Sequence, residues 1–275
     1  MNARNGPASP GDLTLRALAA GYIGLLILLP VCALASEALR EGLGALWHEA
    51  ALPQALVSLR LTILLAAVIV VIDSITGTAT AWVLVRYEFP GKSVVNALID
   101  LPFAVPTVVT GIMLVALYGP NSFIGGLLKR FDIEIIFSKP GIILALLFVT
   151  LPFVVRSVQP VLLEMEKEME EAAQTLGASG PSIFFRVILP TIFPSVLTGA
   201  ALSFSRALGE FGSVVIVAGN IPFKTLVAPV HVYGEIESAN LPGATSVSLV
   251  LLGFSFVILV AIHFLQQWSR RHEPV

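Results

Sequence analysis

The sequence predicts an all-α membrane protein with about six transmembrane helices. The 275-residue chain is 56% hydrophobic and only 12% charged, and its mean hydropathy is +0.90. Apolar runs of about 20 residues, the length needed to cross a hydrocarbon core, recur along the whole chain. Runs such as 61–72 and 249–262 are apolar on every side, whereas a membrane strand alternates apolar and polar residues. The bilayer is therefore the predicted solvent, and its spans are predicted helices.

The apolar runs place six spans at about 15–36, 57–85, 97–118, 138–158, 195–218 and 244–268. A seventh, half-buried segment near 220–235 is an alternative addition. The first span also fits a cleavable signal peptide, because Arg16 precedes an apolar run that contains Ala33-Leu-Ala35. We expect no cleavage, because the run is long enough to cross the membrane and cleavage would leave an odd number of spans.

Prolines in the third and fourth spans bear on how regular these two spans are. Pro152 lies near the middle of the fourth span, which makes that span the least regular of the six. Pro102 and Pro106 lie near the start of the third span and remove two backbone donors within a few residues. The irregular backbone there has two interpretations, namely part of a gate or an ordinary proline kink.

Basic residues beside the spans predict the orientation, because Lys and Arg are retained on the cytoplasmic side. With the N-terminus inside, the basic residues on the inner side outnumber those on the outer side. The inner set is Arg4, Arg16, Arg86, Lys92, Arg156, Lys167, Arg186, Arg270 and Arg271, and the outer set is Arg40, Lys129, Arg130, Lys139 and Lys224. Both termini are therefore predicted to be cytoplasmic.

The chain divides into a cytoplasmic tail, a first span with its outer loop, one large transmembrane domain and a second cytoplasmic tail. Their ranges are 1–14, 15–54, 55–268 and 269–275. The large domain includes a long cytoplasmic loop over residues 159–194. No stretch is left for a soluble domain, and membrane lipid is an expected partner.

The cytoplasmic loop contains Glu171-Ala-Ala-Gln-Thr-Leu-Gly177, followed after nine residues by Val187-Ile-Leu-Pro190. Residues before Gly177 are almost all good helix formers, and Gly readily adopts the left-handed conformation that ends helices. A second short helix is predicted to start at Pro181 and to end at Pro190. Two helices around a glycine hinge would protrude as a knob. Ala172 and Ala173 permit close docking there, and Glu171 offers a charge to a partner; a solvated connector is the alternative.

The fifth span carries Ser203-Phe-Ser-Arg-Ala-Leu-Gly-Glu-Phe-Gly212. Arg206 and Glu210 are four residues apart, so they share one helix face and can pair. Ionisable residues within a span are costly and usually face a bundle interior or a water-filled path. One interpretation is an ion pair that fixes helix packing. The other is that this face lines a transport path, where Arg206, with Ser203, Ser205 and Glu210, accommodates an anion.

Several classes of chemistry are excluded by the residues that are missing. A P-loop needs Gly, four residues and then Gly-Lys-Ser/Thr; Gly91-Lys-Ser93 has the last part, but Arg86 occupies the first position. The four histidines are scattered, and Cys32 is the single cysteine, so no metal spacing exists. No interleaving of basic and aromatic residues indicates nucleic acid. We predict a non-enzyme subunit without cofactor, metal or nucleic-acid partner.

The loop motif resembles the EAA signature of bacterial ABC-importer permeases, with Val187 where that family often has Ile. The motif over 206–212 resembles the oxyanion branch of these permeases, which imports sulfate, thiosulfate, molybdate and tungstate. Within that branch, the segments 86–92, 100–107 and 216–225 resemble the T-type subunit of sulfate/thiosulfate permeases. The resemblance covers about residues 55–268.

The resemblance implies the type I ABC importer permease fold and an inner-membrane location. It implies a second permease subunit, in a heterodimer for sulfate, together with two copies of a cytoplasmic ATP-binding subunit and a periplasmic sulfate/thiosulfate-binding protein. It also implies that the loop is a coupling helix that docks on the ATPase through Glu171, Ala172, Ala173, Gly177, Leu189 and Pro190. A molybdate/tungstate permease and a secondary anion carrier are the alternatives, although the inverted repeats typical of carriers are not seen.

Overall fold

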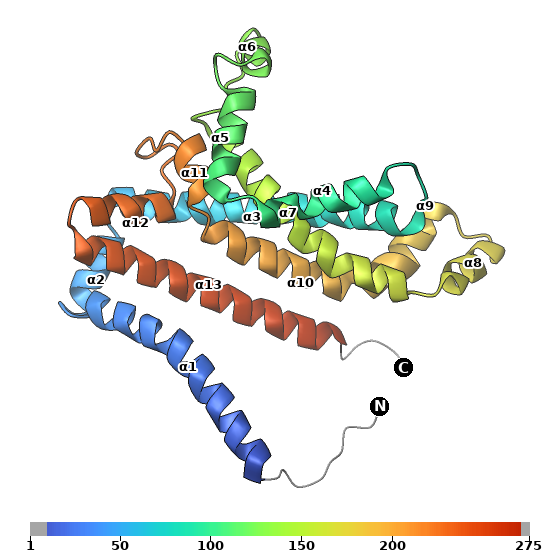
Figure 1. The fold of residues 1–275 in the computed structure, drawn as a ribbon, viewed down its shortest axis with the longest axis horizontal. Helices are drawn as coiled ribbons and strands as arrows, with labels where there is room; N and C mark the ends of the chain where they lie inside the picture. The colour runs from blue at the N-terminus through green and yellow to red at the C-terminus, as the bar shows by residue number, and fades with distance from the viewer. Residues whose placement is uncertain (1–9, 271–275) are drawn as a thin grey trace.

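The computed structural model describes residues 10–270, and the regular elements within that range are helices (Figure 1). In chain order they are α1 (Pro10–Ala38), α2 (Leu43–Ala50), α3 (Pro53–Arg86), α4 (Lys92–Ala104), α5 (Thr107–Tyr118), α6 (Phe123–Lys129), α7 (Lys139–Glu164), α8 (Lys167–Thr175), α9 (Gly180–Ile183), the π-helix η1 (Phe184–Ile188), α10 (Leu189–Leu208), α11 (Gly212–Val217), α12 (Ala228–Glu237) and α13 (Leu241–Arg270). The predicted tails 1–14 and 269–275 fall mostly outside the described residues.

Five helical stretches are long and apolar enough to cross a membrane, and a bent pair of helices is the candidate for a sixth span. The five are α1, α3, α7, α13 and the stretch Gly180–Leu208, which comprises α9, η1 and α10. The sixth consists of α4 and α5, which pass the same test only together and are bent by 115°. The prediction of an all-α protein with about six spans is confirmed.

The bend between α4 and α5 has a local cause. Val105 has φ −89° and ψ 126°, an extended conformation, and the residue before a proline is driven out of the helical region by the proline ring. Pro106 then serves as the N-cap of α5. The third span was predicted as one helix with irregular backbone at its start. The structure instead has two helices in different directions, with α5 and α6 projecting from the bundle (Figure 1).

Three predicted boundaries were wrong. The short helix expected to end at Pro190 continues into α10, because the wide turn of η1 precedes the proline, which then lies in the first turn of α10. The fifth span was expected to reach residue 218, but α10 ends at Leu208 and α11 is a separate short helix. The fourth span extends to Glu164, with Pro152 and Pro160 inside it. The segment near 220–235 contains α12, which is too short to span.

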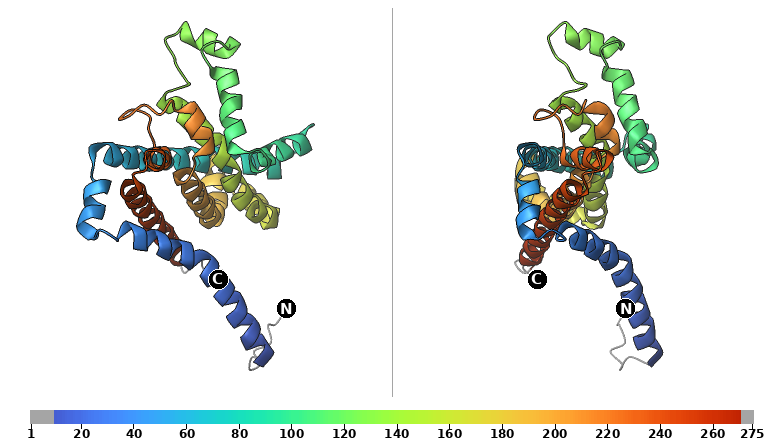
Figure 2. Two further views of the ribbon diagram at one scale, coloured as in Figure 1. Left: turned by 60° about the vertical axis from the view of Figure 1, so that its left-hand side comes forward. Right: turned by 90° about the vertical axis from the view of Figure 1, so that its left-hand side faces the viewer.

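The core lies where α7 is packed between α3 and α10. A Cβ added at Gly77 of α3 would lie 2.8 Å from the Val154 Cβ, and one added at Gly199 of α10 would lie 2.6 Å from the Val154 Cα. Glycine thus lets both helices approach the same turn of α7. Figure 2 shows these helices together in one bundle, while α1 diverges from it.

Hydrogen bonds fix the same three helices at the level of Thr150. Its hydroxyl oxygen lies 2.6 Å from Asp73 Oδ2 on α3, and Ser203 Oγ on α10 donates to the Thr150 carbonyl at 3.1 Å. All three residues are buried. Because these polar groups lack water, their mutual contacts define one relative position of α3, α7 and α10.

Candidate coupling loop and transport path

The loop between α7 and α10 has the geometry of a glycine-terminated helix. In α8, the Gly177 N–H donates to the Gln174 carbonyl at 2.9 Å and the Ala178 N–H donates to the Ala173 carbonyl at 3.0 Å. These two bonds form a Schellman motif, which requires a left-handed residue at the turn. Gly177 has φ +83°. The prediction that the helix stops at this glycine is confirmed, and α8 projects at one end of the bundle (Figure 1).

The predicted docking residues differ in exposure. Glu171, Ala172 and Gly177 are exposed on α8 and its turn. Leu176, which the sequence analysis did not single out, is 88% exposed at the tip.

The remaining predicted docking residues lie where the loop meets the bundle. Ala173 and Leu189 are half-buried and pack against one cluster that contains Ile183, Ile188 and Ile192. Pro190 is exposed in the first turn of α10. A shared apolar cluster thus connects α8 to the start of α10, so the loop is packed against the membrane spans.

An ion pair that sequence reasoning missed connects the loop to α3. Arg86 at the end of α3 lies with its Nη2 2.5 Å from Glu170 Oε1, and its side chain is only 10% exposed. A recess of about 400 Å³ lies beside this pair, lined in part by Trp82, Lys167 and Gln174. The sequence signal was weak, because Glu170 is one of several acidic residues and only the helix contact selects it.

Arg206 and Glu210 form the ion pair that their spacing predicted. Arg206 Nη2 lies 2.6 Å from Glu210 Oε2, and the two side chains are 34% and 1% exposed, respectively. Glu210 Oε1 accepts hydrogen bonds from the Ser213 backbone N–H at 2.9 Å and from the Ser213 hydroxyl at 2.8 Å. The carboxylate therefore lies at the N-terminus of α11, where backbone N–H groups favour negative charge. Glu210 holds Arg206 while leaving part of the guanidinium accessible.

The two predicted serines do not join this pair. Ser203 is buried and donates to the Thr150 carbonyl on α7. The Ser205 hydroxyl donates to the Ala201 carbonyl of its own helix at 2.9 Å. Of the predicted anion-path residues, the structure therefore brings Arg206 and Glu210 together, whereas both serine hydroxyls bond to backbone carbonyls elsewhere.

Helix α5 lies directly against the helix that follows the ion pair. A Cβ added at Gly111 of α5 would lie 2.8 Å from the Ile216 Cβ of α11, and one added at Gly212 would lie 2.2 Å from the Thr107 Oγ1 of α5. The two helices are in backbone-close contact. A displacement of α5 would therefore move α11 and the neighbouring Glu210.

The residues that could bind a metal are scattered in the part of the chain that the structure describes. Within residues 10–270, no group of three or more His, Cys, Asp or Glu side chains could hold a metal ion. Cys32 is an exposed, free cysteine on α1. The expected lack of a cofactor stays a prediction.

Comparison with known proteins assigns the family. Residues 73–272 match the family described as "Binding-protein-dependent transport system inner membrane component". The chain is 46% identical over 251 residues to the sulfate transport system permease protein CysT of Synechocystis sp., covering 91% of this chain and 88% of that protein. It is 40% identical over 251 residues to the protein of that name from Escherichia coli, covering 91% of each.

The fold is similar to that of solved ABC transporters. A bacterial ABC transporter that imports the polysaccharide alginate matches with a TM-score of 0.77 and 17% identity, over 96% of this chain and 97% of that one. The structure of the MetNI methionine ABC transporter matches with a TM-score of 0.59 and 16% identity, over 77% of this chain and 94% of that one. At these identities the likeness concerns the fold alone.

The family match and the fold agree with the geometry of the spans and the loop. The subunits of this family are noncatalytic and transmembrane, so ATP hydrolysis belongs to another subunit, and transport depends on a separate binding protein. The chain belongs to the binding-protein-dependent transport system inner membrane components, as a multi-pass permease subunit of an ABC importer.

Proposed function

We propose that this chain is the permease subunit of an ATP-driven sulfate importer that also carries thiosulfate. The observation that supports the proposal is the similarity to relatives named sulfate transport system permeases, at 40–46% identity over about nine-tenths of the chain. The family match over residues 73–272 includes the α8 loop and the Arg206 segment.

The proposed assembly contains a second, different permease subunit, two copies of a cytoplasmic ATPase and a periplasmic binding protein for sulfate and thiosulfate. Exposed apolar surface supports a membrane partner: Ile112 and Leu117 of α5 are 55% and 46% exposed, and Phe123 of α6 is 89% exposed. Because α5 and α6 project from the bundle (Figure 1), this apolar surface is proposed to be covered by lipid and by the second subunit.

The α8 loop is proposed to dock on the ATPase through Glu171, Ala172, Ala173 and Gly177, with Leu189 and Pro190 supporting it from α10. Both termini are proposed to lie in the cytoplasm, on the side of α8. The end of α13 and the α8 loop lie toward the same end of the bundle in Figure 1, which supports this orientation. Binding of ATP by the partner would bias the inward-open and outward-open states by a few kcal/mol.

Arg206 is proposed to contact the anion on its path, held in place by Glu210, with Ser203 and Ser205 stabilising the span that carries it. A guanidinium has five N–H donors, and within the described residues the contact found for this one is Glu210. The remaining donors are available to an oxyanion. The paired carboxylate offsets part of the charge, which suits a site that an anion must also leave.

Uptake of labelled sulfate tests the proposed function directly. Cells lacking this subunit are complemented with it, with excess thiosulfate or molybdate as competitors and with ATP depleted in a parallel sample. ATP-dependent rescue that thiosulfate blocks and molybdate barely affects is the expected result. Rescue of molybdate uptake in place of sulfate uptake would assign the chain to molybdate import, and uptake that persists without ATP would contradict the proposal.

The docking role has its own test. Glu171→Lys reverses the exposed charge of the loop, so we expect sulfate uptake to be lost while the subunit stays in the membrane at normal abundance. Glu166→Lys is the matched control, because Glu166 is exposed just before α8 and outside the docking motif. Normal uptake by the Glu171 variant would contradict docking through this residue.

A further inference from the structure

Helix α4, the first helix of the bent pair α4–α5, is attached to the bundle by few apolar contacts. The structure describes every residue of α4, and of these only Ile99 is buried. Val94, Leu98 and Phe103 are more than half exposed. The helix against which α4 packs is α7, and Phe103 adds an edge-to-face ring contact with Phe153 of that helix, with 5.3 Å between the ring centroids. Apolar packing alone therefore holds α4 weakly.

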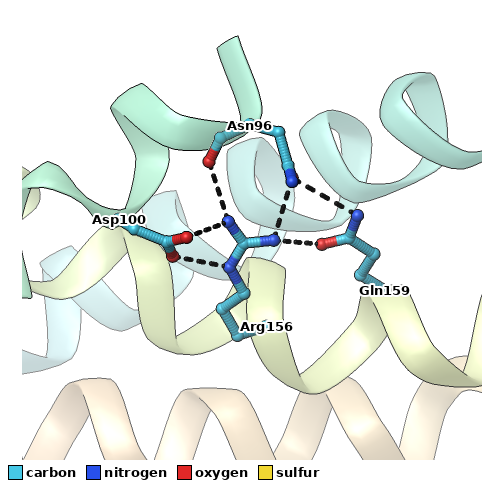
Figure 3. Close-up of polar contacts among 4 residues, drawn as sticks. All are labelled: Asn96, Asp100, Arg156 and Gln159. Atoms are coloured by element: carbon cyan, nitrogen blue, oxygen red, sulfur yellow. Dashed lines mark hydrogen bonds and ion pairs between the residues drawn. The ribbon is translucent and has the colours of Figure 1, made fainter. Parts of the chain in front are cut away.

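A polar network supplies the specific attachment, and Figure 3 shows it. Arg156 of α7 binds the Asp100 carboxylate of α4 through two bonds, with Nε and Nη2 each donating at 2.7 Å. Its Nη1 donates to Asn96 Oδ1 at 2.9 Å and to Gln159 Oε1 at 2.5 Å, and its Nη2 donates to the Asn96 backbone carbonyl at 2.8 Å. We call Arg156, Asp100, Asn96 and Gln159 the Arg156 network.

All five N–H donors of Arg156 are used in this network. Three of its five bonds go to side-chain or backbone oxygens that are neutral, and two go to a carboxylate. No donor is left for a transported anion, so Arg156 is not a second anion site. A charged group within a membrane span is costly, and a fully used bidentate fork is the arrangement that offsets the cost while defining one geometry.

The Arg156 network lies between the α8 loop and the bend from α4 into α5, the two regions that the proposed transport mechanism has to connect. Arg156 is eight residues before Glu164, where α7 ends and the chain continues into α8. Asp100 is four residues before Ala104, where α4 ends at the 115° bend into α5. Helix α5 in turn contacts α11, whose N-terminus holds Glu210 and through it Arg206.

We propose that Arg156 and Asp100 are positioning residues that make α4 and α7 move as one body, so that movement of the coupling loop reaches the broken span and the Arg206 site. This inference rests on the proposed function for the meaning of transport, but the rigid attachment of α4 to α7 does not depend on which anion is carried. The device is an arginine fork, because a single-point contact would leave α4 free to rotate on α7.

The test uses the whole transporter in liposomes, with ATP hydrolysis and sulfate uptake measured on the same preparation. Arg156→Lys keeps the charge and loses the fork, and Asp100→Asn keeps the shape and loses the charge. For both variants we expect sulfate taken up per ATP hydrolysed to fall about tenfold, while ATP hydrolysis per assembled complex stays near the normal rate. Because both quantities are normalised to assembled complex, reduced assembly does not decide the result.

The matched control is Lys92→Gln. Lys92 makes a 2.7 Å ion pair with Glu88 at the start of α4, and that pair does not reach α7. We expect this variant to take up the normal amount of sulfate per ATP. Normal uptake per ATP in Arg156→Lys and Asp100→Asn, or an equal loss in Lys92→Gln, would overturn the proposal.

A second readout does not depend on the transported anion. In a Cys32→Ser background, spin labels at Leu98→Cys of α4 and Leu163→Cys of α7 report the distance between the two helices, since both positions are more than half exposed. We expect that distance to be the same in the nucleotide-free and vanadate-trapped states, and to differ between those states once Arg156→Lys is added. A distance that changes with nucleotide in the parent, or stays constant in the variant, overturns the proposal. If the parent transports no sulfate, the proposed function fails and this readout still decides the attachment.

Discussion

Arg156 and Arg206 are both arginines of the transmembrane helices, and both pair with a carboxylate, yet they differ in how many of their N–H donors have partners and in how buried the carboxylate is. Arg156 has all five donors used by four neighbouring oxygen-bearing groups on two helices, and its carboxylate partner Asp100 is half exposed. Arg206 has a buried partner, Glu210, and its side chain is 34% exposed, close to the 28% of Arg156. The comparison teaches that the role of an arginine inside a membrane protein depends on how many of its N–H donors already have partners. A guanidinium with all donors used positions helices, and one with unused donors can bind a ligand.

The largest expected effect separates packing from transport at Arg206. Arg206→Ala leaves the Glu210 carboxylate buried without its cation, so we expect a loss of about 3 kcal/mol of stability and low abundance in the membrane. Adding Glu210→Gln removes the unpaired charge. We expect this double variant to regain abundance, measured by immunoblot of membranes, without regaining sulfate uptake. Uptake restored along with abundance would assign the ion pair to packing alone.

A smaller loss of stability is expected at Arg156. Arg156→Ala leaves Asp100 unpaired, but this carboxylate is 51% exposed and keeps access to water. We expect a cost of about 1 to 2 kcal/mol, measured as a lower midpoint temperature of the purified complex on size-exclusion after heating. A loss larger than that of Arg206→Ala would reverse the comparison, and would show that the Arg156 network is the main support of α4.

Lysine substitution should discriminate between the two sites. Arg206 has one ion-pair contact, which an ammonium can also make, so we expect Arg206→Lys to keep sulfate uptake within about threefold of the parent. The Arg156 network needs two guanidinium nitrogens that bind the Asp100 carboxylate together, and a lysine has only one nitrogen to offer. Equal sensitivity of uptake per ATP to lysine at both positions would contradict the distinction between a fork and a point charge.

The smallest expected effects come from the outer members of each network. Ser213→Ala removes one of two bonds that Ser213 makes to Glu210, and Gln159→Ala removes one of five bonds to Arg156. We expect each variant to lose about 1 kcal/mol of stability and to keep most of its sulfate uptake. The loss is measured as a lower midpoint temperature, by the same heating assay as for Arg156→Ala. A loss of uptake in Ser213→Ala at normal stability would show that the orientation of Glu210 is itself limiting for transport.

The local features of the α8 loop and of the Arg206 segment were predictable because they depend on neighbours in the chain. The end of α8 at Gly177 follows from a backbone conformation that favours glycine. The pairing of Arg206 with Glu210 follows from helical spacing. By contrast, Glu170 was one acidic residue among several, and its partner Arg86 is separated from it by more than eighty residues of chain.

The broken span shows the same limit for the fold. Pro102 and Pro106 predicted irregular backbone, but not that α5 would leave the direction of α4 by 115°. A proline removes a donor and restricts its predecessor, and it leaves the direction of the following helix to the surfaces that helix meets. Here those surfaces include α11, where Gly111 and Gly212 permit close approach. The roles expected for Ser203 and Ser205 depended likewise on which way each hydroxyl turned.

The sequence by itself determined the membrane location, the helical class, the approximate spans and the two motifs, because apolar run length, helix propensity and i to i+4 spacing are properties of a single segment. Only the tertiary structure decided which charges meet. Arg156 and Asp100 are 56 residues apart in the chain and come together because α4 packs on α7. A guanidinium selects its oxygen partners by distance and direction in space, and the order of residues along the chain does not contain those quantities.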